Sequence, residues 1–84
     1  MGEKIRIYLY FPVVHRWFTC DLLNHFSFHE LFRILSPFFE KEMKGMYYLH
    51  EDMMVMEYTQ DLPCDKDVSL LAAGVRTGMS FVIY

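Results

Sequence analysis

The stretch "AAGVRTGMSFVIY", residues 72–84, decides the fold that this sequence predicts. The segment from Gly74 to Gly78 has the composition of a turn. Residues 79–84 then alternate and predict a strand, with Phe81 and Ile83 facing inward and Val82 and Tyr84 facing outward. This strand has no partner close to it in the sequence, so we expect it to lie beside the N-terminal strand.

The N-terminal third of the chain predicts a β-hairpin. "KIRIYLYF" (4–11) alternates cleanly, with the set Ile5, Ile7 and Leu9 opposed to the set Arg6, Tyr8 and Tyr10. Pro12 cannot donate to a sheet and ends this strand. "HRWFTCDL" (15–22) alternates again, with Phe18, Cys20 and Leu22 on one side and Trp17, Thr19 and Asp21 on the other.

"SFHELFRILSPFFEKEMKG" (27–45) predicts a helix. Ser27 and Glu30 have the spacing of a capping box, and Gly45 is a suitable stop. The apolar face is formed by Phe28, Leu31, Phe32 and Leu35. Pro37 removes a backbone donor, so we expect a helix over about 28–35, followed by a kink or a fresh start at Pro37.

The second half of the chain predicts short strands and loops. Residues 46–58 favour two strands around a turn at Glu51-Asp52, and residues 59–67 favour a loop. Residues 68–75 predict one helical turn that packs Leu70 or Leu71 inward. The predicted fold class is therefore α+β: a single domain over 1–84, with one helix on a mixed sheet of four to five strands.

Composition limits the function classes. The 84 residues are 54% hydrophobic and 18% aromatic, which is more apolar material than so small a core hides, and this indicates a surface patch for a partner. A net charge of −3 without a basic stripe argues against nucleic acid. No apolar run reaches the ~18 residues of a membrane span, so we expect no direct membrane insertion.

The C-terminal segment "SLLAAGVRTGMSFVIY" (69–84) resembles that of the ubiquitin-like β-grasp domains. Those domains commonly carry a leucine, a Gly-Ile/Val pair, two polar residues, a glycine or acidic residue and an alternating strand. Here the corresponding residues are Leu70, Gly74, Val75, Gly78, Phe81 and Ile83. The resemblance covers nearly the whole chain, although Pro37 departs from it. It implies the β-grasp fold.

The same resemblance implies a binding module. Conjugated ubiquitin-like modifiers and sulfur carriers end in a Gly-Gly tail, whereas this sequence ends at Tyr84 with no glycine after Gly78. If the chain is complete, we expect no activation at its C-terminus. Among tailless examples it looks most like the small bacterial YukD/EsaB-type proteins of type VII (WXG) secretion. That likeness implies an accessory or regulator in the cytoplasm, with a membrane component of the secretion apparatus as a partner.

Outward-facing side chains, five of them aromatic, are the candidate partner-binding residues. They are Tyr8, Tyr10, Trp17, Tyr48, Val82 and Tyr84. The resemblance implies that this face is the usual docking surface, and Tyr and Trp are enriched at interfaces. A homodimer, or a subunit of an unrelated assembly, remains an alternative use of the same face. The rings would otherwise only stabilise the sheet through cross-strand pairs.

No catalytic, cofactor-binding or metal-binding residues are predicted, and we expect no enzyme. The four histidines show no zinc spacing. The two cysteines favour reduced thiols: Cys20 suits a core position, and acidic neighbours of Cys64 are expected to raise its pKa. A sulfur-carrier or redox component of an enzyme system is the alternative from another class. It is disfavoured by the missing glycine tail and by only two cysteines.

Overall fold

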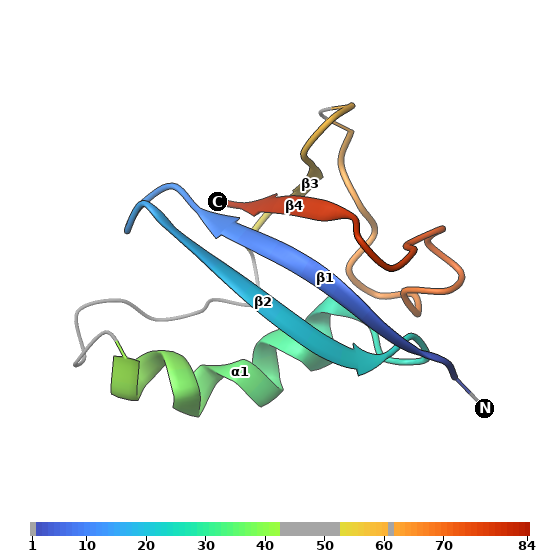
Figure 1. The fold of residues 1–84 in the computed structure, drawn as a ribbon, viewed down its shortest axis with the longest axis horizontal. Coiled ribbons are helices and arrows are strands. Elements are labelled where there is room, and N and C mark those ends of the chain that lie inside the picture. Colours follow the sequence, from blue (N-terminus) through green and yellow to red (C-terminus); the bar gives the residue numbers. More distant parts are fainter. Residues whose placement is uncertain (1, 43–52, 61) are drawn as a thin grey trace.

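The computed structural model describes residues 2–42, 53–60 and 62–84 of the chain (Figure 1). Along these residues the elements are β1 (Lys4–Phe11), β2 (Arg16–Leu23), α1 (Phe28–Glu42), β3 (Val55–Glu57) and β4 (Ser80–Ile83). The four strands form one sheet in the order β2-β1-β4-β3. The predicted α+β architecture of one helix on a mixed sheet is confirmed.

The pairing of β4 with β1 confirms the expectation drawn from the C-terminal segment. The two strands are parallel, with Tyr8 opposite Ser80 and Tyr10 opposite Val82. β1 and β2 form an antiparallel hairpin. β3 and β4 also pair in antiparallel fashion, but the long segment between them is not a hairpin turn. β4, the last strand in the sequence, is therefore one of the two central strands of the sheet. It pairs with β1 of the N-terminal hairpin on one side and with β3 on the other.

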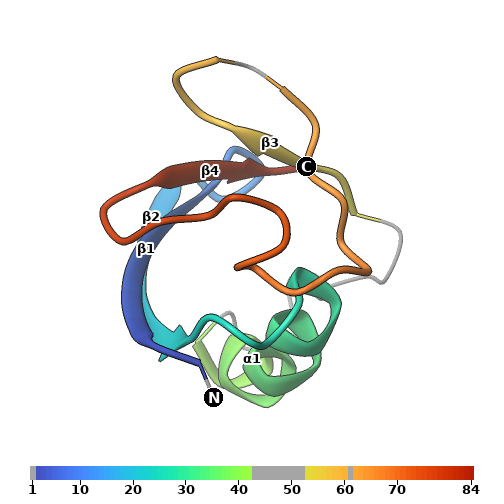
Figure 2. The same ribbon diagram turned by 90° about the vertical axis from the view of Figure 1, so that its right-hand side faces the viewer.

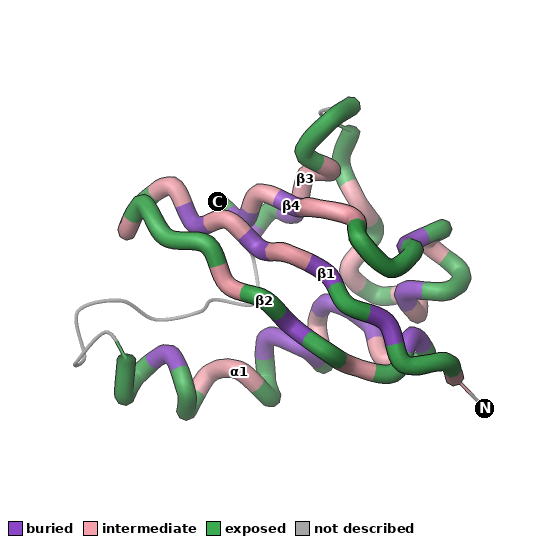
Figure 3. Tube along the Cα trace, in the orientation of Figure 1, coloured by how far each residue is buried: buried purple, intermediate pink, exposed green. Residues whose placement is uncertain are grey.

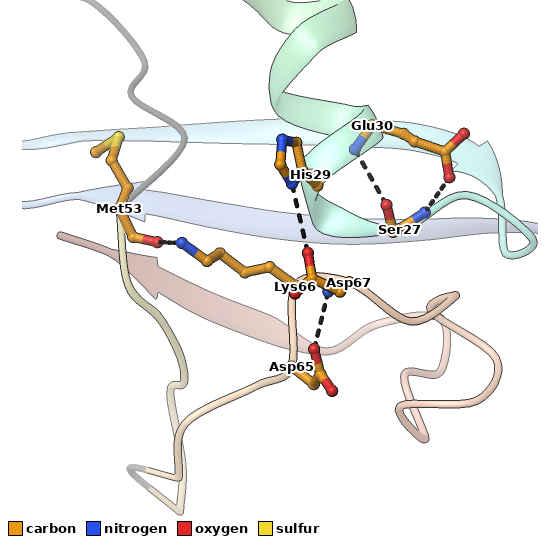
Figure 4. Close-up of polar contacts among 7 residues, drawn as sticks. All are labelled: Ser27, His29, Glu30, Met53, Asp65, Lys66 and Asp67. Atoms are coloured by element: carbon orange, nitrogen blue, oxygen red, sulfur yellow. Dashed lines mark hydrogen bonds and ion pairs between the residues drawn. The ribbon is translucent and has the colours of Figure 1, made fainter.

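The helix α1 begins where the capping box predicted. The Ser27 backbone N–H donates to Glu30 Oε1, and the Glu30 N–H donates to Ser27 Oγ, both at 3.1 Å (Figure 4). This reciprocal pair satisfies two N–H groups that have no partner inside a helix.

Pro37 does not divide the helix, so of the two outcomes expected there, a kink or a fresh start, the fresh start is wrong. α1 is one element from Phe28 to Glu42 with Pro37 inside it. The cause lies in packing beyond the proline. Phe39 is fully buried, with its ring centroid 4.7 Å from that of Phe11 and 4.7 Å from that of Phe18. This contact holds the C-terminal half of the helix on the sheet despite the lost backbone donor. Gly45 lies outside the described residues.

The core lies between α1 and the inward face of the sheet. Figure 2 shows the helix below the sheet, with the C-terminal segment curling over the remaining side. The predicted inward residues of β1 and β4 are all buried, and they are joined by Phe28, Leu31 and Phe32 of the helix. The purple positions alternate along β1 in Figure 3, as expected for a half-buried strand.

The turn before β4 is fixed by two glycines. Gly74 and Gly78 have φ values of 80° and 89°, in the left-handed region that favours glycine. The Gly78 N–H donates to the Arg6 carbonyl at 2.6 Å, which aligns β4 with β1. In the preceding turn Leu70 is buried and Leu71 is exposed, which decides between the two leucines that the sequence left open.

The segment before β3 and the loop after it are tied to the start of α1. The Lys66 ammonium donates to the Met53 carbonyl, and His29 Nδ1 lies 3.5 Å from Asp67 Oδ1 (Figure 4). The strand predicted before the Glu51-Asp52 turn, the turn itself and Tyr48 lie outside the described residues. The later strand of that predicted pair is β3.

Candidate docking surface on the sheet

A row of apolar side chains crosses the outward face of the sheet, opposite α1. Strand register places Trp17 beside Tyr10, Tyr10 beside Val82, and Val82 beside Met56. One residue from each strand therefore contributes to the row. Neighbouring strands lie about 4.7–4.9 Å apart, so side chains that are paired in this way form a continuous surface.

Aromatic rings from the two sheet edges meet over this row. The ring centroid of Trp17 lies 5.0 Å from that of Tyr10 and 5.5 Å from that of Tyr58, which follows β3. β2 and β3 are the two outer strands of the sheet, so both side chains must lean inward across it to make contact. Trp17 is nevertheless 50% exposed and Tyr58 is 54% exposed.

The surface continues at the C-terminal end of β4. The Tyr84 N–H donates to the Met54 carbonyl at 3.0 Å, and both side chains are more than half exposed. We name the whole set the aromatic face. It consists of Tyr8, Tyr10, Trp17, Met54, Met56, Tyr58, Val82 and Tyr84.

An ion pair borders the aromatic face. Arg6 contacts Asp21 through two hydrogen bonds, Nε to Oδ1 at 2.7 Å and Nη2 to Oδ2 at 3.0 Å. Arg6 and Asp21 pair across β1 and β2. The hydrogen bond from Arg6 holds the pKa of the Asp21 carboxyl below its usual range. The outward side of the hairpin is thus charged at one end and aromatic at the other.

Five of the six predicted partner-binding residues lie on this one face. Tyr8, Tyr10 and Val82 are half-buried there, while Trp17 and Tyr84 are exposed. Tyr48 lies outside the described residues.

Met54, Met56 and Tyr58 were not among the predicted residues. The signal for them was present in "MMVMEY" (53–58), whose alternation gave two candidate faces. The structure buries Met53 and Val55 and turns the other set outward.

The thiols are not set up for nucleophilic chemistry. Burial raises the pKa of the Cys20 thiol to about 11, and burial followed by the charge of Glu57 raises the pKa of Cys64. The direction for Cys64 agrees with the sequence-based expectation, but the cause is burial rather than the neighbouring aspartates. Within the described ranges, no three or more His, Cys, Asp or Glu side chains gather as a metal site would require.

No model of a protein family matches this chain, and no curated protein matches it. Solved structures do. The ubiquitin-like domain of EccD5 from Mycobacterium xenopi aligns with a TM-score of 0.65 at 12% identity, over 98% of this chain and 93% of that one. The ubiquitin-like domain of Plasmodium falciparum Dsk2 aligns with a TM-score of 0.63 at 15% identity, over 98% of this chain and 100% of that one. The fold is a ubiquitin-like β-grasp.

A third match is to a longer protein. ATBAG1, solved in complex with HSP70, aligns with a TM-score of 0.68 and 20% identity over 95% of this chain. The chain spans only 39% of the ATBAG1 chain. At these identities the similarities establish the fold. In the part of the chain that the structure describes, no helix is both long enough and apolar enough to cross a membrane.

Proposed function

We propose that this β-grasp domain is a protein-interaction module that docks a partner protein through the aromatic face. The observation that carries the proposal is the half-exposed Trp17–Tyr58 pair, continuous with exposed Tyr84 and Met54. Trp and Tyr offer large contact area with little side-chain entropy to lose, which is why they dominate interface hot spots.

The exposed area is sufficient to matter for binding. A fully buried aromatic side chain removes about 150–250 Å² from water. Trp17, Tyr58 and Tyr84 each keep about half of their surface exposed, so a partner would cover roughly 300 Å² on these three alone. At ~25 cal/mol per Å² this corresponds to about 6–9 kcal/mol before the cost of association is subtracted.

The alternative, in which the rings only stabilise the sheet, accounts for part of the geometry. Tyr10, Trp17 and Tyr58 do contact one another. Sheet stabilisation, however, favours burial of the rings, and both ring systems of the Trp17–Tyr58 pair remain half exposed. It also gives no reason for the exposure of Tyr84 and Met54, which belong to the same aromatic face.

For the cellular context, we propose an accessory or regulatory role beside a type VII-like secretion apparatus. The support is the likeness of the "GVRTGM" turn to that of the YukD/EsaB type. Similarity to a mycobacterial ubiquitin-like domain is compatible with it. The complex of ATBAG1 with HSP70 gives no support for HSP70 as a partner of this chain, because most of ATBAG1 lies outside the similarity.

Affinity capture from the native host tests the proposal. The test variant is Tyr58→Ala combined with Tyr84→Ala, and the matched control is Leu71→Ala, an apolar residue in the turn before β4 that is also more than half exposed. We expect the double variant to lose the partner that the wild type and the control retain. Equal recovery with all three proteins would overturn docking through the aromatic face. A partner that is not a component of a secretion system would overturn the cellular context alone.

A further inference from the structure

The two outer edges of the sheet differ. The edge of β3 is covered by the segment that follows it: the Glu57 N–H donates to the Leu62 carbonyl, and the Cys64 N–H donates to the Val55 carbonyl. The eight-residue edge of β2 is uncovered, since no described residue pairs with its outer side. An open edge of this length is a template for strand pairing, and proteins commonly guard it with Lys or Pro. β2 contains neither.

The open groups on this edge follow from the hairpin register. The Asn24 N–H donates to the Glu3 carbonyl, so the groups of Asn24 point toward the β1 side. Because the direction alternates along a strand, the N–H and C=O groups of the odd-numbered residues of β2 point away from β1. These residues are Trp17, Thr19, Asp21 and Leu23.

An apolar groove runs beside the same edge, between β2 and α1. It has a volume of about 480 Å³ and is lined on the helix by Leu31, Ile34, Leu35 and Phe38. Ile34 is 57% exposed and Phe38 is 47% exposed. Figure 1 shows α1 running below β2 at this side of the molecule, so a strand added to β2 would bring its inward side chains over the groove.

We propose that the β2 edge and this groove form a homodimer interface, in which β2 pairs in antiparallel fashion with β2 of a second copy. The occupant is a second copy because the edge is self-complementary in one register. With the two-fold axis at Cys20, Phe18 faces Leu22 of the second copy and Trp17 faces its Leu23. The small Cys20 side chain then lies where the two strands approach most closely. Moving the axis to Thr19 would instead place Trp17 opposite an aspartate.

The size of the contact agrees with a weak dimer. Eight strand residues span ~26 Å at ~3.3 Å per residue, and a sheet with one helix layer is ~20 Å deep. The footprint is therefore ~500 Å² on each copy and ~1,000 Å² in total, the lower limit for specific interfaces. The strand pair supplies about eight backbone hydrogen bonds. The dimer joins two sheets into one and covers Ile34 and Phe38 on both copies. It does not depend on the proposed docking function.

The test is the average mass of the full chain by light scattering or sedimentation, from about 10 µM to about 1 mM, concentrations at which a weak dimer is detected. We expect the mass to rise from 10.1 kDa toward twice that value. Thr19→Pro removes an open-edge donor while leaving the β1 ladder intact, and Ile34→Glu charges the groove. Each should weaken the dimer about tenfold or more. Thr19→Val and Tyr58→Ala are the controls and should leave it unchanged.

Two results would overturn the proposal. One is a mass that stays at 10.1 kDa across the range. The other is a dimer that Tyr58→Ala weakens but both Thr19→Pro and Ile34→Glu leave intact, which would assign self-association to the aromatic face. Ile34 is an exposed helix position, so Ile34→Glu keeps the test decisive even if Thr19→Pro prevents folding.

Discussion

Trp17 of β2 and Tyr58, which follows β3, contact each other across the full width of the sheet, with ring centroids 5.5 Å apart. The two residues come from the opposite edges of the sheet and from distant parts of the sequence. Their contact joins the N-terminal hairpin to the C-terminal half of the domain on the outward side, as the core does on the inward side.

Substitutions at this pair should be coupled in stability. In a double-mutant cycle of Trp17→Ala and Tyr58→Ala, we expect an interaction energy of about 0.5–1.5 kcal/mol, the range for aromatic pairs. Urea unfolding of the four proteins measures it. The control is a second cycle that combines Trp17→Ala with Leu71→Ala. The effects of these two substitutions on stability should be additive. An interaction energy of zero for Trp17 and Tyr58 would show that the contact contributes nothing to stability in solution.

Pro37 inside α1 should lower the stability of the fold, and the packing of Phe39 against the sheet compensates for this loss. Pro37 is exposed, so Pro37→Ala restores a backbone donor without disturbing the core. We expect the variant to be more stable by about 1–3 kcal/mol. The control is Ser36→Ala, which changes neither a proline nor the core and should shift stability by less than about 0.5 kcal/mol. Thermal unfolding compares the two, and a destabilised Pro37→Ala would contradict an intact helix through residue 37.

The sequence predicted best the strands in which apolar and polar residues alternate and the helix that begins with a capping box. Such local signals predict β1 and the start of α1. The pairing of the terminal strands was inferred instead from the absence of a partner near the last strand in the sequence. The continuation of α1 past Pro37 could not be predicted, because it depends on Phe39 packing against Phe11 and Phe18 from another part of the chain. Propensity alone stops the helix, and tertiary contacts override it.

The candidate site shows the same division. The strand phases identified Tyr8, Tyr10, Trp17, Val82 and Tyr84 as outward residues. They did not identify Tyr58, because "MMVMEY" offers two apolar faces and only the position of β3 at the sheet edge decides which is buried. The open edge of β2 was likewise invisible to local patterns, since the order of strands determines which edges remain free.

Acid should weaken the fold partly through Asp21. Arg6 holds the folded-state pKa of Asp21 below its unfolded value of about 4. The carboxylate therefore stabilises the fold above that unfolded value, and this contribution is lost as the pH falls through the folded pKa. We expect Asp21→Asn to flatten the acid side of the stability–pH curve relative to the wild type. Identical pH dependence of the two proteins, measured by denaturation from pH 7 to below pH 3, would show that the ion pair is not formed in solution.

The two thiols should differ in reactivity. Cys20 is buried, with a pKa of about 11, whereas Cys64 is only half-buried. The thiolate is the reactive form, so a thiol-specific reagent at pH 8 should modify Cys64 first and Cys20 only slowly. The variants Cys20→Ser and Cys64→Ser assign the two phases, and unfolding in urea should equalise them. Faster reaction of Cys20 in the folded protein would be inconsistent with its position in the core.

Site-specific photo-cross-linking in the native host tests the central claim most directly. A photoreactive phenylalanine replaces Tyr58 on the aromatic face in one protein and Leu71 on a different surface in the other. We expect a discrete cross-linked product from position 58, heavier than a dimer of the chain, and none from position 71. A product of that kind from position 71 alone, or equal products from both, would contradict docking through the aromatic face.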